Sequence, residues 1–133
     1  MKIDISIGEL VDKVTILSIK LEKISDSSKV INVRKEYELL LKSMTDCGIG
    51  TESEEFLTLK DVNLKLWEIE DRIRVKEVEQ AFDREFIDLA RSIYFINDKR
   101  AEIKKRINLA TGSELVEEKE FVDYAKTSKD TMF

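Results

Sequence analysis

The sequence contains no histidine and no proline, and it has only four glycines and one cysteine in 133 residues. Without histidine, this chain alone cannot build a Ser-His-Asp or Cys-His catalytic group, a histidine-ligated zinc site or an imidazole pH switch. The lack of proline and glycine leaves little to interrupt a helix. Cys47 has no partner within the chain for a disulfide, so we expect a cytoplasmic protein in which Cys47 is a small loop residue rather than a reactive thiol.

Long apolar runs are also missing, since no window of about 18 apolar residues exists, and we expect no membrane-spanning segment. The net charge of −5 argues against general nucleic-acid binding, which depends on neutralising phosphates. Nothing resembles a glycine-rich phosphate loop, and we expect no cofactor. Hydrophobic residues make up 42% of the chain and charged residues 38%, which is typical of a folded helical protein with both signs of charge on its surface.

Apolar residues repeat at three- and four-residue steps along most of the chain, which predicts an all-α bundle of two helical hairpins in a single domain, residues 1–133. Ser6 with Glu9 forms a capping box at the start of the first helix, and Asp83 is the only cap available for the last one. Gly112 is a credible stop for that last helix. The expected helices are residues 7–24, 29–45, 53–80 and 83–110, of which the last two are long.

Both ends of the chain carry weaker patterns. The first residues alternate between apolar and polar side chains, so a short extended N-terminus is an open alternative to irregular chain. Residues 113–125 fit either a short helix or an extended tail, and residues 127–133 have the character of a frayed end.

Polar residues interrupt the apolar side of both long helices when the residues are placed about 100° apart. Buried charges cost several kcal/mol unless they are paired, so three interpretations follow. The one we favour is an internal network of salt bridges and amides; the others are a ligand cleft and a partner surface. The candidate polar cluster comprises Asn63, Trp67, Glu70, Arg74, Tyr94, Asn97 and Arg100.

Two further patterns have ordinary explanations. Glu68 and Asp71 lie one turn apart and are weak candidates for Mg²⁺, but Glu68 points away from the apolar side, so we expect a solvated helix surface and no metal. The basic run of residues 99–106 suggests an anion patch, yet basic residues near a helix C-terminus also complement the helix dipole. We favour the second explanation.

Three segments, residues 6–17, 63–74 and 86–100, resemble in order and spacing an uncharacterised family of short bacterial and phage proteins, the domain of unknown function DUF6165. The resemblance covers nearly the whole chain and implies no activity. It implies an association with surface-sugar and glycosyltransferase genes. The shared polar positions it implies are Glu9, Asp12, Lys13, Asn63, Trp67, Glu70, Asp71, Arg74, Arg91, Tyr94, Asn97, Asp98 and Arg100.

We therefore expect a small soluble accessory module that binds a protein partner or forms a homodimer. The heptad-like stripe of the first helix motivates the dimer, because an added apolar seam needs a partner. The alternative is an enzyme or a binding protein for a phosphorylated small molecule, such as a nucleotide, a nucleotide sugar or a sugar phosphate. In that alternative Arg74, Asn97 and Arg100 would hold the anion, and Glu70 would act as a base.

Overall fold

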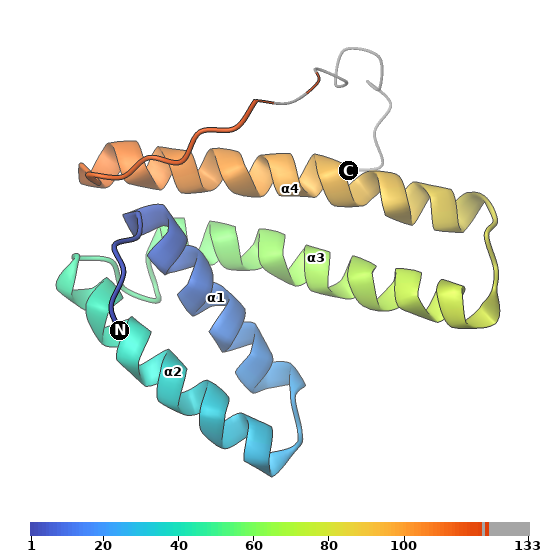
Figure 1. The fold of residues 1–133 in the computed structure, drawn as a ribbon, viewed down its shortest axis with the longest axis horizontal. Coiled ribbons are helices and arrows are strands. Elements are labelled where there is room, and N and C mark those ends of the chain that lie inside the picture. Colours follow the sequence, from blue (N-terminus) through green and yellow to red (C-terminus); the bar gives the residue numbers. More distant parts are fainter. Residues whose placement is uncertain (121, 123–133) are drawn as a thin grey trace.

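The protein is all-helical in the computed structural model, which describes residues 1–120 and 122 (Figure 1). Two long helices follow two shorter ones, and the described residues include no strand, so the predicted fold class is confirmed. Residues 1–6 have no regular secondary structure. None of the described helices is both long enough and apolar enough to cross a membrane. The helices are α1 (Ile7–Lys23), α2 (Ser27–Asp46), α3 (Glu54–Glu79) and α4 (Arg84–Thr111).

Every helix begins at a polar cap. The Ser6 hydroxyl accepts a hydrogen bond from the Glu9 amide at 3.0 Å, and the Asp26 carboxylate accepts from the first amides of α2. Ser53 caps α3 by accepting from the Phe56 amide at 3.2 Å, and Asp83 caps α4 by accepting from the Phe86 amide at 3.0 Å. These bonds satisfy amide groups that have no partner inside a helix, which is why short polar side chains set the boundaries.

The turn between the two long helices needs neither glycine nor proline. Gln80 ends α3 in the left-handed conformation, with φ 55°, and its amide bonds back to the carbonyl of Glu77. Lys76 then donates to the Asp83 carboxylate across the turn at 2.9 Å. Asp83 therefore both caps α4 and closes the turn.

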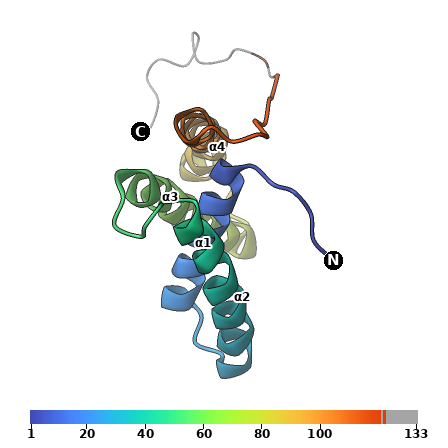
Figure 2. The same ribbon diagram turned by 90° about the vertical axis from the view of Figure 1, so that its left-hand side faces the viewer.

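The four helices form two hairpins of unequal length. The backbone of α1 approaches all three other helices, whereas α2 approaches only α1 among them. In Figure 1 the α1–α2 hairpin lies against the half of the α3–α4 hairpin that holds the start of α3 and the end of α4, and the other half extends beyond it. Figure 2 shows the same arrangement from the covered end, with α3 and α4 running away behind α1.

The core lies where α1 meets the other helices, and it ends midway along the long hairpin. In α3 the last buried residue is Leu66, thirteen residues before the helix ends. The apolar stripe of α1 is buried within the chain, so it provides no free seam for a second copy, and the reason we gave for a dimer does not hold. The core comprises Leu10, Val11, Val14, Met44, Ile49, Phe56, Leu59, Val62, Leu66, Ile96, Ile103 and Ile107.

After Gly112 the chain turns back along α4 without forming a helix, and we call residues 113–120 the return segment (Figure 1). The Ser113 hydroxyl accepts a hydrogen bond from the Ile7 amide at 3.1 Å, which ties this segment to the start of α1. Through residue 120 the chain thus follows the extended alternative for residues 113–125. Residues 121 and 123–125, the remainder of that prediction, lie outside the described residues. So does the frayed end predicted for residues 127–133.

Candidate functional site

A buried carboxylate joins three of the four helices. Asp12 of α1 is 1% exposed, and it is the one buried charged residue in the described part of the chain. Its Oδ1 accepts a hydrogen bond from Asn63 Nδ2 of α3 at 2.9 Å. The same Asn63 amide donates to Thr15 Oγ1 at 2.8 Å, and Thr15 Oγ1 donates to the Asp12 carbonyl. The buried polar atoms around Asp12 are thus paired with one another, as burial requires.

Arg100 of α4 completes this network. Its Nε donates to Asp12 Oδ1 at 2.9 Å, and its Nη2 donates to Asp12 Oδ2 at 2.5 Å. The two parallel bonds are the fork geometry that guanidinium and carboxylate groups favour. The hydrogen bonds to Asp12 raise the pKa of Arg100 above its ordinary value, while burial opposes that shift and the negative charges of Asp12, Glu9 and Glu70 reinforce it. Arg100 is therefore charged at neutral pH, as the ion pair with Asp12 requires.

A glycine brings α1 close enough to α4 for this pair to form. A Cβ at Gly8 would lie 2.4 Å from the main-chain oxygen of Lys104 and 2.9 Å from Asn108 Oδ1. The Gly8 amide donates a hydrogen bond to Asn108 Oδ1 at 2.6 Å. Because Asp12 follows Gly8 by one helical turn, the close approach at Gly8 places the Asp12 carboxylate beside α4.

The structure places the seven candidate residues in separate groups. Asn63 and Arg100 meet through Asp12, whereas Glu70 and Arg74 form a partly exposed pair at 3.9 Å on α3. Trp67 is half-buried, and the exposed Tyr94 ring lies beside that of Phe95, with ring centroids 5.1 Å apart. Asn97 lines a cleft along α4. The residues separate because α1 covers only part of the long hairpin. Asn63 and Arg100 lie in the covered part, whereas Glu70, Arg74 and Tyr94 lie in the part nearer the turn and are partly or fully exposed.

The periodicity argument missed Thr15, Asn108 and Asp12, which lie on the first and last helices. Asp12 entered the sequence analysis only as one of the shared polar positions that the family resemblance implies. A usable signal existed in the first helix, where Gly8, Asp12, Thr15 and Ile19 recur at helical spacing and so share one side. A small residue and two polar residues on one side indicate a close polar contact rather than a solvated surface.

The two weak metal candidates have different surroundings. Glu68 lines a cleft of about 440 Å³ between α3 and α4 together with Glu85 and Asp88, and Asp71 is exposed elsewhere on α3. Within residues 1–120 and 122, no group of three or more acidic or cysteine side chains is arranged to hold a metal ion.

Beyond Asn63 and Arg100, one side of the long hairpin is left without a covering helix. On α3, Trp67, Glu70, Arg74 and Val78 all lie within about 60° of Asn63 around the helix axis. On α4, Phe86, Ala90 and Ile93 lie within about 80° of Arg100. This is the side that α1 covers in the other half of the hairpin, and here no helix of the structure covers it. We call these seven residues the hairpin face.

Comparison with known proteins places the chain in a family. The sequence model of DUF6165, described as a family of unknown function, matches residues 1–131. The chain belongs to this family. No curated protein and no solved structure matches the chain.

Proposed function

We propose that the protein is a small interaction module that associates through the hairpin face, and that the partner seated there is a second copy of the chain. The observation that carries this proposal is the uncovered half of a hairpin built from helices of 26 and 28 residues. Its hairpin face keeps Trp67 and Ile93 only half-buried and leaves Val78 84% exposed. Apolar side chains that are rimmed by charges and left uncovered are typical of an association surface.

The charges on this face favour a second copy over an unrelated partner. Glu70 and Arg74 lie one turn apart and carry opposite signs, and their own ion pair is long at 3.9 Å. When a twofold axis brings two such faces together, Glu70 of each copy meets the Arg74 of the other. Two hairpins packed in this way make a four-helix arrangement in which the apolar residues are covered. The face is therefore complementary to itself in charge.

The second candidate function, an enzyme or binding protein for a phosphorylated small molecule at this same cluster, has weaker support. The Arg100 fork is already occupied by Asp12, and Arg74 is paired with Glu70 rather than grouped with Arg100. Two of the three groups that were expected to hold an anion between the long helices, Arg74 and Arg100, are thus engaged with the protein itself.

Sedimentation velocity with charge-reversal variants tests the dimer. We expect the wild type to form a dimer at micromolar concentrations, and Glu70→Arg and Arg74→Glu to be monomers because each places like charges across the axis. An equimolar mixture of the two variants should recover dimers, since each then meets its opposite charge. Arg34→Glu on α2 is the matched control, because Arg34 is exposed and lies off the hairpin face.

The mixing experiment separates the proposal from simple misfolding. Two variants that have lost their fold cannot restore each other, whereas two folded monomers with complementary faces can. A wild type that stays monomeric at all concentrations, or a mixture that remains monomeric, would show that the second copy is not the partner.

We further propose that the module works in the cytoplasm. The support is Cys47, which is exposed and, as the only cysteine of the chain, has no internal partner. Thiol alkylation in intact cells should modify Cys47 fully, and a blocked thiol would argue for an oxidising compartment.

A further inference from the structure

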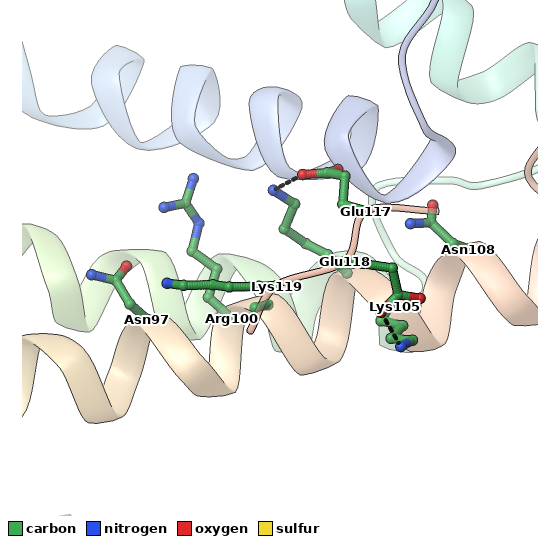
Figure 3. Close-up of a pocket in the computed structure, with 9 residues that line it drawn as sticks. Asn97, Arg100, Lys105, Asn108, Glu117, Glu118 and Lys119 are labelled. Carbon is green, nitrogen blue, oxygen red and sulfur yellow. Dashed lines mark hydrogen bonds and ion pairs between the residues drawn. The ribbon is translucent and has the colours of Figure 1, made fainter. Parts of the chain in front are cut away.

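A second polar site lies on the side of α4 that the return segment covers. There a cleft of about 310 Å³ is bounded by α4 on one side and by the return segment on the other (Figure 3). Such a volume is at the low end for small-molecule sites, which span about 300–1,000 Å³. The residues that the argument uses are Lys104, Lys105 and Asn108 of α4 with Glu117 and Glu118 of the return segment.

Asn108 brings an unsatisfied donor to this cleft. The residue is 1% exposed, and its Oδ1 accepts the Gly8 amide at 2.6 Å. That bond sets the orientation of the amide, because exchanging oxygen and nitrogen would place two donors face to face. Its Nδ2 has no hydrogen-bond partner among the described residues, and Figure 3 shows this nitrogen turned toward the cleft. A buried donor left unpaired is destabilising. An acceptor oxygen of a ligand in the cleft would pair with Asn108 Nδ2 and remove this cost.

Two neighbouring lysines in the same cleft are paired with two neighbouring carboxylates from the return segment. Lys105 Nζ lies 2.9 Å from Glu118 Oε2, and Lys104 Nζ lies 3.6 Å from Glu117 Oε2. Lys104 also contacts Glu9 at 2.5 Å. Both carboxylates of the return segment are exposed, and exposed ion pairs contribute little. The return segment thus places two exposed negative charges on a basic site, where a ligand with two negative charges can compete with them.

The start of α1 adds to the attraction for an anion at this place. The Ser6 hydroxyl, which caps the helix, donates to Glu117 Oε1 at 2.9 Å. A helix N-terminus carries partial positive charge, so it favours a negative group beside it. Glu117 therefore sits where Lys104, Ser6 and the helix end all favour an anion, and Asn108 Nδ2 still lacks an acceptor.

We propose that this cleft binds a small molecule carrying two closely spaced negative charges, either a phosphate ester or a dicarboxylate, and that Glu117 and Glu118 are internal competitors for it. One ligand oxygen accepts from Asn108 Nδ2 and from Lys104 Nζ, and a second faces Lys105. Binding displaces both glutamates, so the ligand and the return segment exclude each other. This site is separate from the hairpin face and does not depend on dimer formation.

Proton–nitrogen correlation spectra of the side-chain amides test the proposal directly. The chain contains four asparagines and one glutamine, so the Asn108 amide pair is one of only five. Inorganic phosphate and succinate are titrated separately at constant ionic strength. We expect a saturable shift of the Asn108 amide protons with at least one of them, and the anion that binds tells a phosphate group from a dicarboxylate.

Three variants in the cleft and one control variant outside it show whether the shift reports this site. Glu117→Gln combined with Glu118→Gln should tighten binding about two- to fivefold, because exposed competing pairs are removed. Lys104→Gln should weaken binding about tenfold or more, since a charge-assisted bond is lost. Lys105→Gln gives a second reading if Lys104→Gln does not fold. Lys99→Gln, on the same helix but outside the cleft, should bind as the wild type does.

The outcomes are distinct. A saturable Asn108 shift that depends on Lys104 or Lys105 and is strengthened by loss of the two glutamates supports the site. No saturable shift with either anion, or the same response in Lys99→Gln and in the cleft variants, overturns it. None of these variants alters a residue of the hairpin face. A negative result for the cleft would therefore say nothing against the proposed dimer.

Discussion

Replacing Asp12 by asparagine is the sharpest perturbation of the fold, because it removes the charge at the junction of α1, α3 and α4 while keeping the side-chain shape. In Asp12→Asn, an amide nitrogen replaces one carboxylate oxygen, and one donor then faces another from Arg100 or Asn63. A hydrogen bond to a charged group contributes about 1.5–3 kcal/mol. Breaking a buried ion pair on one side costs about 3–5 kcal/mol. The expected loss lies at the lower end of that second range, because the Arg100 side chain is 29% exposed and keeps some hydration.

We therefore expect Asp12→Asn to lower the free energy of unfolding by about 3 kcal/mol, a large share of the roughly 5–15 kcal/mol that holds a domain together. Urea unfolding followed by far-UV circular dichroism, at one fixed protein concentration, measures this loss. Asp61→Asn is the matched control, because Asp61 forms an exposed pair with Lys65 at 3.3 Å. That substitution should change stability by less than about 0.5 kcal/mol.

A double-mutant cycle with Arg100→Met tests the cause. Methionine keeps much of the apolar stem of Arg100 while it removes the guanidinium, so the double variant no longer leaves a charge without its counterpart. We expect the Asp12 and Arg100 substitutions to be coupled by about 2 kcal/mol. A loss below about 1 kcal/mol for Asp12→Asn, or a coupling near zero, would refute the claim that this pair ties α1 to α4.

Two further predictions concern the backbone and the turn. Gly8→Ala should destabilise the protein by about 2 kcal/mol, because its Cβ would clash with the carbonyl of Lys104; Gly50→Ala, which meets nothing within 4 Å, should be neutral in the same urea assay. The hydrogen bond from Lys76, followed by that from the Phe86 amide, lowers the pKa of the Asp83 carboxyl. The ionised carboxylate therefore stabilises the fold above the ordinary aspartate pKa of about 3.9, and this contribution is lost as pH falls through the lowered value. Asp83→Asn should reduce the melting temperature at pH 7 but not below that lowered pKa, and an equal reduction at both pH values would contradict the assignment.

Helix boundaries could be predicted closely because they depend on local chemistry. Ser6, Asp83 and Gly112 act through hydrogen bonds or backbone angles within a few residues, and such signals are visible in the sequence itself. The observed helices begin and end within one or two residues of the expected positions, and even the turn before Asp83 lies where a single cap suggested it.

The candidate site could be predicted only in part, because periodicity tells which residues share a side of a helix but not which helix crosses that side. Asn63 and Arg100 were recognised as polar residues on an apolar side, yet their common partner Asp12 lies 51 and 88 positions away. Glu70 and Arg74 lie on the same side of α3 as Asn63. They are not covered by a third helix, because α1 crosses the hairpin before reaching them. Burial at those positions depends on helix crossing, which the sequence pattern does not contain.

The central claim, that the hairpin face associates with a second copy, is tested most directly by amide hydrogen exchange at two protein concentrations. The account predicts that raising the concentration slows exchange in residues 67–93 of α3 and α4, while exchange in α2 stays the same. Arg74→Glu should abolish that difference. Exchange that does not depend on concentration, or added protection confined to α2, would contradict the account.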